Sequence, residues 1–487
     1  MIDLSVNGKQ LESAVKRVRE RNIVIPTFAQ MKNPNLAPAN VKADLKKIGL
    51  WDINPRNLFR ITWKNEPTSQ GGGFGGVNYI EFPKSITGVN ARIIGLVGKW
   101  FPTGAHKVGA SFGCLVPRLI TGQFDPVNHK AVWPSTGNFC RGGAYDATLL
   151  GCESIAILPE GMSRERFEWL SKVAGEVIAT PGTESNVKEI YDKVWELRKT
   201  RDNISVFNQF EEFGNYLWHY EVTGHALEEV INKELRPRGN FRAACFTTGS
   251  AGTIACGDYL KQVFPTSKIA AGEAVQCPTL YENGFGAHRI EGIGDKHVPW
   301  IHNVKNTDLV IAVDDNVVVN VARLFNEKAG KAYLVKQGVP EGLVGMLDQL
   351  GFSGIANVGM CIKTAKYYEM GEEDIVVTVL TDSMDLYQSR LAEMSEEFGE
   401  YTEVNAAADY ARYLQGLSTD YLQELSYADR RRVHNLKYFT WIEQQGKTYE
   451  EIVAQWYDQD YWTNYQSQVP EIDALIEDFN NRVGLAN

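Results

Sequence analysis

Lys107 stands in surroundings that favour covalent chemistry. Small residues dominate positions 103–111 around it, and the pattern after it predicts a helix that begins near this lysine. A cation at a helix N-terminus opposes the helix dipole, which favours the neutral amine that Schiff-base formation requires. A solvated surface lysine would have the same local sequence. The interpretation of Lys107 as a reactive amine therefore depends on what other segments of the chain provide.

A polar loop follows the apolar run at 131–133. It consists of Ser135, Thr136, Gly137 and Asn138, which offer two hydroxyls, backbone N–H groups and an amide. These groups can bind a carboxylate. Similar residues also form ordinary turns that cap helices, so the loop is compatible with a binding role or with a purely structural one.

A loop of small residues lies between the β-rich run at 241–247 and a predicted helix. Its members are Gly249, Ser250, Ala251, Gly252 and Thr253. Backbone N–H groups in such a turn, together with the N-terminus of the next helix, can hold a phosphate. The segment is not a Walker loop, because no Gly-Lys-Ser/Thr follows, and it lacks a dinucleotide fingerprint. A tight strand-to-helix turn without a ligand is equally compatible with it.

The elements that must position these loops alternate between β-rich runs and helical patterns from about residue 80 to 385. Such alternation predicts parallel sheets covered by helices on both faces, with ligands bound at the carboxyl ends of the strands. The fold class is therefore α/β with two parallel-sheet domains. The predicted strands are 131–133, 154–158, 176–179, 204–207, 241–247, 308–313 and 374–380.

Two extensions flank this predicted core. Residues 1–76 contain an amphipathic helical pattern at 11–21 and end in a glycine-rich stretch at 71–76. Residues 389–487 are rich in aromatic and acidic residues and have helical spacing, which predicts a helical C-terminal extension. Between them we place a smaller domain with Lys107 at 77–215 and a larger domain with the glycine-rich loop at 216–388.

The composition narrows the classes of partner and compartment. The 487 residues carry a net charge of −10, which argues against nucleic acid or an anionic membrane as the main partner. The start of the chain lacks the basic and apolar regions of a secretory signal, and no window approaches about 18 uninterrupted apolar residues. The seven cysteines are scattered without a CxxC pair, which predicts free thiols in a reducing cytoplasm and no metal site.

Taken in chain order, these motifs resemble the tryptophan synthase β and cysteine synthase group of pyridoxal-phosphate enzymes, known as fold type II. The shared order is the lysine, the Ser/Thr-Gly-Asn loop, the glycine-rich loop and a late serine, Ser353. Segments 158–166, 208–224 and 291–294 are similar to further signatures of cysteine synthase. The resemblance covers about residues 77–388 and excludes both extensions.

The resemblance implies a role for each matched residue. Lys107 would hold pyridoxal 5'-phosphate as a Schiff base and later move the proton at the substrate Cα. Asn138 would contact the phenolic oxygen of the cofactor, and Ser353 would face its pyridine nitrogen. The loop from Gly249 through Ser250, Ala251 and Gly252 to Thr253 would bind the cofactor phosphate. The substrate carboxylate would be bound by Ser135, Thr136, Gly137 and Gln209.

A serine at the pyridine nitrogen leaves that nitrogen largely unprotonated, which favours loss of a β-substituent. The resemblance thus implies β-elimination or β-replacement on a serine- or cysteine-like amino acid through an aminoacrylate. We expect the protein to be a homodimer. A dehydratase or ammonia-lyase remains an alternative. From other classes, a nucleotide-binding oxidoreductase and a non-catalytic scaffold also remain.

Three features depart from cysteine synthase and leave the substrate open. His106 precedes the lysine, as in tryptophan synthase β, and Ala251 replaces a glycine of the phosphate loop. The stretch 139–141, which ends in Arg141, replaces the small residues that usually follow the loop asparagine. Arg141 is compatible with pairing to an additional substrate anion or with a structural role.

Overall fold

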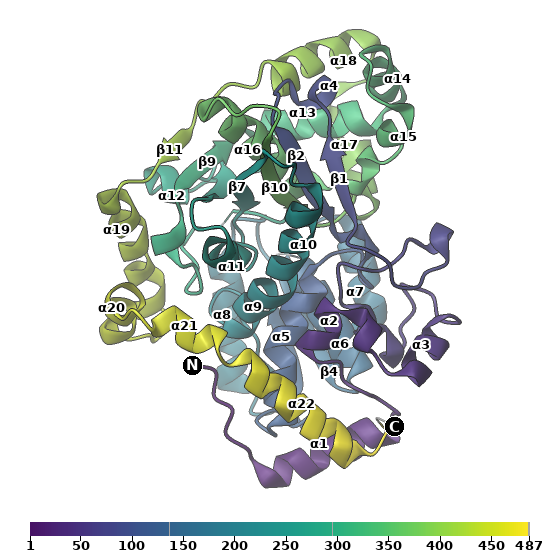
Figure 1. The fold of residues 1–487 in the computed structure, drawn as a ribbon. Coiled ribbons are helices and arrows are strands. Elements are labelled where there is room, and N and C mark those ends of the chain that lie inside the picture. Colours follow the sequence, from purple (N-terminus) through teal and green to yellow (C-terminus); the bar gives the residue numbers. More distant parts are fainter. Residues whose placement is uncertain (136, 295, 486–487) are drawn as a thin grey trace.

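The computed structural model describes residues 1–135, 137–294 and 296–485 and contains two separate β-sheets within a largely helical chain (Figure 1). Every strand pair in the centres of both sheets is parallel. This arrangement confirms the predicted α/β class with two parallel sheets. Each predicted strand is present, and each of its ends lies within one residue of the expected position.

The smaller sheet has four strands in the order β5-β4-β3-β6. Its strands are β3 (Lys130–Pro134), β4 (Glu153–Pro159), β5 (Glu176–Thr180) and β6 (Ile204–Val206). The helices around it are α5 (Lys107–Ile120), α6 (Asn138–Leu149), α7 (Arg164–Val173), α8 (Val187–Thr200) and α9 (Phe213–Trp218).

Alternate residues of the smaller sheet enter two different cores. Val132 and Ile155 pack with Val194 of α8 on one face. Trp133 and Ala156, each one position further along its strand, join the main core on the face that α6 covers. Because both faces of β3 and β4 are buried, these two central strands are mostly apolar, which is why they were recognisable as continuous runs.

The larger sheet has seven strands in the order β1-β2-β10-β7-β8-β9-β11. Its central strands are parallel, whereas β1 and β11 pair antiparallel at the two edges. The strands are β1 (Tyr79–Phe82), β2 (Arg92–Val97), β7 (Asn240–Thr247), β8 (Lys268–Ala274), β9 (Leu309–Val313), β10 (Asp374–Leu380) and β11 (Leu422–Glu424).

Residues 79–97 join the larger sheet, although the boundaries drawn from the sequence place them with the smaller domain. The buried run of β2 pairs in parallel register with β10, with Ile93 beside Val376 and Leu96 beside Val379. Because this segment is close to Lys107 in the sequence, it was assigned to the smaller sheet. In the structure β2 and β10 lie side by side, and the apolar side chains of both strands are buried. The loop after β2 then carries the chain from the larger sheet to Lys107.

Helices cover both faces of the larger sheet. The longest of them, α16, packs across β2, β7, β8, β9 and β10. The helices that follow or flank these strands are α4 (Lys84–Thr87), α10 (Gly224–Glu234), α11 (Ala255–Val263), α12 (Thr279–Glu282), α13 (Asp315–Asn326), α14 (Lys328–Lys336), α15 (Glu341–Val344) and α16 (Phe352–Tyr367).

The first helix and the last helix of the chain, α1 and α22, lie side by side at one end of the molecule, whereas α17 and α18 of the C-terminal region lie at the opposite end (Figure 1). The N-terminal helices are α1 (Gly8–Glu20), α2 (Phe28–Lys32) and α3 (Ala39–Leu45). The C-terminal region is mainly helical, as predicted, and comprises α17 (Gln388–Phe398), α18 (Glu403–Asp409), α19 (Tyr427–Asn435), α20 (Tyr449–Tyr457), α21 (Tyr461–Gln466) and α22 (Val469–Val483), with β11 as its one named strand among the described residues.

Side chains of the C-terminal region bind backbone groups of the N-terminal segment. Asn480 accepts a hydrogen bond from the N–H of Ile25 at 3.0 Å and donates to its carbonyl oxygen at 2.7 Å. Gln468 bonds both backbone groups of Ile2 in the same way. Asp473 accepts from two N–H groups at the start of α2. The last helix therefore fixes the path of the first thirty residues.

None of the helices in the described part of the chain combines the length and the apolar character that spanning a membrane requires.

Candidate active site

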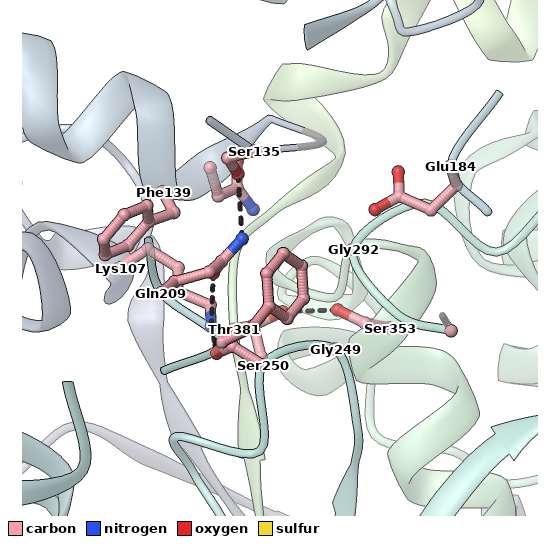
Figure 2. A pocket seen from close by; sticks show the side chains of 13 residues that line it. Lys107, Ser135, Phe139, Glu184, Gln209, Gly249, Ser250, Gly292, Ser353 and Thr381 are labelled. Carbon is pink, nitrogen blue, oxygen red and sulfur yellow. Dashed lines mark hydrogen bonds between the residues drawn. The ribbon is translucent and has the colours of Figure 1, made fainter. Parts of the chain in front are cut away.

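Seven of the predicted site residues line one pocket at the carboxyl ends of β3, β7 and β10 (Figure 2). The other predicted residues that the structure describes belong to the same two loops but do not line the pocket: Gly137, Ala251, Gly252 and Thr253. Four of its lining residues come from the glycine-rich and Ser/Thr-Gly-Asn loops, and Lys107 enters it from the start of α5. The pocket is lined by Lys107, Ser135, Asn138, Phe139, Glu184, Gln209, Phe210, Gly249, Ser250, Gly292, Gly294, Ser353 and Thr381.

Lys107 is the first residue of α5, as the sequence predicted. Its Nζ donates to Ser250 Oγ at 2.9 Å and lies 3.4 Å from Gln209 Oε1 (Figure 2). The preceding His106 is fully buried, and burial together with the adjacent Lys107 charge holds the pKa of His106 well below its ordinary value. A neutral imidazole therefore lies behind the lysine, and it packs edge-on against His219.

The glycine-rich loop presents unused backbone donors. Within the described residues, no N–H group from Gly249 to Thr253 donates a hydrogen bond. Ser250 Oγ accepts from Asn215 Nδ2 at 2.9 Å, which fixes the loop next to Lys107. A Cβ on Gly252 would lie 2.2 Å from Asn215 Oδ1, so only glycine fits there. Five free amides before α11 form a concave donor surface that suits a phosphate.

The Ser/Thr-Gly-Asn loop links β3 to α6. Ser135 Oγ accepts hydrogen bonds from the N–H of Gly137 at 3.2 Å and from Gln209 Nε2 at 3.1 Å. The structure therefore brings Gln209 to this loop, as the resemblance implied. Gly137 lies against the buried guanidinium of Arg166, where a Cβ would approach within 2.7 Å. Thr136, which was assigned to the same loop, lies outside the described residues.

Asn138 connects the pocket to a buried polar network that sequence reasoning missed. Its Nδ2 donates to Asp382 Oδ2 at 2.6 Å, and the same oxygen accepts from Tyr387 OH at 2.6 Å. Arg166 in turn donates to Tyr387 OH at 2.8 Å and to Glu291 at 2.6 Å. Asn138 Oδ1 is buried and has no partner among the described residues, so it is available to a ligand.

Ser353 lies in the pocket at the start of α16, and its hydroxyl is hydrogen-bonded to that of Thr381 (Figure 2). Thr381 was not singled out from the sequence, although it directly follows the predicted strand that became β10. The rule that ligands bind beyond the carboxyl ends of parallel strands was the available signal. Glu184 and Gly292 also line the pocket without having been predicted.

These features fit one prosthetic group. A lysine amine, a cradle of free amides and an unpartnered Asn138 oxygen match the aldehyde, the phosphate and the ring oxygen of pyridoxal phosphate. Within the described residues, no group of three His, Cys, Asp or Glu side chains is placed to hold a metal ion. The fold and the pocket together define a pyridoxal-phosphate enzyme of the two-sheet type.

Comparison with protein families gives the same assignment. Residues 102–332 match the model of the family described as pyridoxal-phosphate dependent enzyme. The matched stretch contains Lys107 and both predicted loops. The departures of the chain from cysteine synthase at His106 and Ala251 therefore lie within the matched stretch.

Two curated relatives show how far the similarity extends. The chain is 27% identical over 289 residues to a probable cysteine synthase of Bacillus subtilis, which covers 59% of this chain and 85% of the relative. It is 24% identical over 321 residues to the cystathionine beta-synthase of Saccharomyces cerevisiae, covering 64% of this chain and 60% of the relative. The remainder of the chain is outside these matches.

Solved structures share the fold at lower identity. An O-acetylserine dependent cystathionine beta-synthase from Helicobacter pylori gives a TM-score of 0.53 at 22% identity, covering 63% of this chain and 95% of the other. An O-acetyl serine sulfhydrylase from Entamoeba histolytica gives 0.55 at 22% identity, covering 69% and 93%. The fold of these two proteins is thus matched over nearly their whole length, and about a third of this chain lies outside the match.

Proposed function

We propose that the protein catalyses β-elimination or β-replacement on a serine- or cysteine-like amino acid, with pyridoxal phosphate bound at Lys107. The observation that carries the proposal is the position of the Lys107 amine, 2.9 Å from Ser250 in the loop whose amides are free. Relatives that are cysteine synthases and a cystathionine beta-synthase support the reaction class.

We assign the pocket residues separate roles in binding the cofactor and in moving the substrate proton. When the cofactor is bound, the amides from Gly249 to Thr253 and the Ser250 hydroxyl would hold its phosphate, and Lys107 Nζ would hold its aldehyde carbon. Asn138 would bond the ring oxygen, and Ser353 would share a hydrogen bond with the ring nitrogen. Lys107 Nζ would also act as the base that takes the proton from the substrate Cα.

The substrate carboxylate is held by Ser135, Gly137 and Gln209. Ser135 Oγ already joins Gln209 Nε2 to the loop, so the donors are fixed before substrate binds. Pyridoxal phosphate withdraws electrons from the substrate Cα when it is bound. A hydroxyl at the ring nitrogen keeps this withdrawal modest, and a good β leaving group then departs readily.

The test is release of product from amino acids that differ in the β-substituent. Cofactor-loaded enzyme is mixed separately with O-acetyl-L-serine, L-serine, L-cysteine and L-threonine, and pyruvate, 2-oxobutyrate, ammonia and sulfide are measured. We expect turnover of at least one of the first three, which Lys107→Ala abolishes. A matched Lys130→Ala variant, at a half-exposed lysine on β3, should retain full turnover.

Two outcomes would contradict the proposal. Turnover of threonine alone would replace it by a dehydratase. Absence of any product, together with amino transfer to a keto acid, would place the enzyme in a different reaction class while leaving the cofactor assignment intact.

We also infer that the protein is a cytoplasmic homodimer. All seven cysteines are buried free thiols, which supports a reducing compartment. Exposed aromatic side chains on the C-terminal helices, such as Tyr427, Tyr449 and Tyr457, offer apolar surface for a second copy. Sedimentation equilibrium measures the mass directly, and a single species of 54.5 kDa would exclude the dimer.

A further inference from the structure

A second cavity lies beside the candidate active site and is not part of it. Its volume is about 340 Å³, and it opens between α6, α7 and the loops before Lys107 and after Asp382. Three segments that supply the active site continue into this cavity within four residues. Gly104 precedes Lys107, Arg141 follows Asn138, and Ser383 follows Asp382. The two cavities therefore share their walls.

Arg141 is the unusual residue of this cavity. Its side chain is only 8% exposed, yet no hydrogen bond or ion pair of its guanidinium occurs among the described residues. Its Nε is buried without a partner. Burial and the nearby Arg166 lower the pKa of Arg141 to about 10. An unpaired buried cation is costly, and natural proteins rarely keep one without a counter-charge.

The charge of the buried Asp382 favours the Arg141 cation, but Asp382 Oδ2 accepts hydrogen bonds from Asn138 and Tyr387 and forms no ion pair with Arg141 among the described residues. The three carboxylates that line the cavity also have other partners. Glu165 accepts hydrogen bonds from the N–H and the hydroxyl of Ser389 at 2.7 and 2.6 Å. Asp385 pairs with Lys99 at 3.0 Å. Glu168 is 3.4 Å from Arg164, which is exposed. Each of these acidic groups has its own partner, so the Arg141 charge remains available to a ligand.

Aromatic rings form the remaining walls. The guanidinium carbon of Arg141 lies 4.3 Å from the centre of the Trp169 ring, which holds the planar group in place. Trp51, stacked on Trp100, lines the cavity as well and is 47% exposed. Lys172 lies at the rim and is exposed. A flat apolar body with a terminal anion complements these walls.

The donor set favours a carboxylate over a phosphate. Phosphate sites normally collect several backbone N–H groups at a helix start. Arg141 lies within α6, and its backbone N–H already donates to the carbonyl oxygen of Gly137 at 3.0 Å. A guanidinium alone presents a planar fork that matches the two oxygens of a carboxylate.

We propose that this cavity is a binding site for a small organic carboxylate, anchored by Arg141 and flanked by Trp51 and Trp169. The site is separate from the loop that binds the carboxylate of the amino-acid substrate. A ligand there contacts the segments that carry Lys107, Asn138 and Asp382, so its occupancy bears directly on the geometry of the active site.

The test measures binding of benzoate to cofactor-loaded enzyme by isothermal titration calorimetry. Benzamide, which has the same shape and no charge, is the comparison ligand. We expect saturable binding of benzoate that is at least about tenfold tighter than that of benzamide. Arg141→Gln should abolish this preference, whereas Arg236→Gln, at an exposed arginine outside the cavity, should leave it unchanged.

Two further variants keep the result decisive. Arg141→Lys retains the charge without the fork, so an intermediate affinity is expected even if Arg141→Gln folds poorly. Gln209→Ala removes a donor of the active-site loop and should change the benzoate affinity by less than about twofold. Benzoate binding that is absent in the wild type, or that responds to Gln209→Ala but not to Arg141 variants, overturns the proposal.

Discussion

At the scale of single residues, the contact between Lys107 and Ser250 joins the two groups to which we assign cofactor binding. The amine proposed to bind the aldehyde and the loop proposed to bind the phosphate are held together by one 2.9 Å hydrogen bond. Asn215 bonds the same hydroxyl from behind and fixes its direction. The distance between the reactive amine and the phosphate cradle is thus set before any cofactor arrives.

Lys107→Ala should remove the covalent attachment of the cofactor. We expect the visible absorbance of the cofactor-loaded wild type to be lost or shifted, because the variant lacks the lysine that lines the pocket. Borohydride reduction followed by peptide mapping should label Lys107 in the wild type and in a Lys99→Ala control. Recovery of the label on a different lysine would show that the assignment is wrong.

Ser353→Asp should change the outcome of the reaction while preserving the pocket. A carboxylate at this position would stabilise a protonated ring nitrogen, which strengthens electron withdrawal at the Cα and favours transamination. We expect elimination to fall by at least about tenfold, or about 1.4 kcal/mol of activation free energy, with keto-acid-dependent side products appearing. Product analysis by chromatography measures both.

A Ser353→Ala variant separates charge from loss of the hydroxyl. It removes the bond to Thr381 but adds no carboxylate, so it should lose activity without gaining transamination. Equal product mixtures from the Ala and Asp variants would remove Ser353 from the ring nitrogen.

Sequence reasoning identified the residues that lie in small-residue loops but missed those held by the tertiary structure. Lys107, Ser135 and Ser250 are each marked by unusual neighbours in the chain. Asp382 and Thr381 look ordinary in sequence, because their importance comes from contact with Asn138 and Ser353, more than 200 and about 28 residues away. A pairing across such a separation leaves no local pattern.

At the scale of elements, the loops after the strands carry both the chemistry and the strain. The glycine-rich loop after β7 places Ala251 at a φ of 60°, a left-handed conformation that side chains rarely adopt. Ala251, which replaces the glycine that cysteine synthases usually have here, therefore carries conformational strain. The same loop keeps Gly252 where contact with Asn215 admits no side chain.

Gly252→Asp should weaken cofactor binding strongly. The new side chain collides with Asn215 and places a carboxylate among the amides that receive the phosphate. We expect the dissociation constant of the cofactor to rise at least about a hundredfold, or nearly 3 kcal/mol, in a spectroscopic titration. Gly342→Asp, in α15 where a Cβ meets open space, is the matched control. Unchanged affinity in Gly252→Asp would exclude this loop from the phosphate site.

The carboxyl group of Glu273, near the end of β8, should make the stability of the fold depend on pH without involving the active site. Glu273 is 2% exposed and accepts hydrogen bonds from the N–H groups of Leu280 and Tyr281 at 2.8 Å. Burial outweighs these bonds and raises the pKa of Glu273 to about 8. In the unfolded chain the ordinary value of 4.5 applies. Between these two values the folded protein binds the additional proton.

This difference makes the folded state less stable as the pH rises from 4.5 to about 8. Each pH unit in that window should lower the free energy of unfolding by about 1.4 kcal/mol through Glu273. Glu273→Gln should remove this contribution, which urea unfolding at pH 6 and pH 8 measures as a difference between variant and wild type. The exposed Glu282→Gln should leave the pH dependence as it is. Identical slopes in all three proteins would contradict the raised pKa.

At the scale of the whole molecule, the sequence predicted the two sheets and the helical C-terminal region but not how the parts combine. The β2 run is short and lies beside Lys107 in the chain, and nothing local indicates that β10 is its neighbour. The sequence also did not indicate where the two extensions pack. Their contacts are single side chains, such as Asn480 and Gln468, that bind backbone groups over 450 residues away.

Asn480→Ala should loosen the junction of the two extensions. It leaves the N–H and the carbonyl of Ile25 without partners in a buried place, which we expect to lower the free energy of unfolding by about 2 kcal/mol. The neighbouring Asn481 is exposed, so Asn481→Ala is the matched control. Urea unfolding gives the stability, and limited proteolysis should cut the variant first near residue 25. Equal stability of both variants would rule out the proposed junction.

The pairing of α22 with α1 also sets an order of events during protein synthesis (Figure 1). The first helix leaves the ribosome long before its partner has been translated. Throughout that interval the part of α1 that packs on α22 has no α22 to cover it. A chain that stops before residue 469 therefore lacks α22 and leaves this part of α1 open to chaperones and proteases.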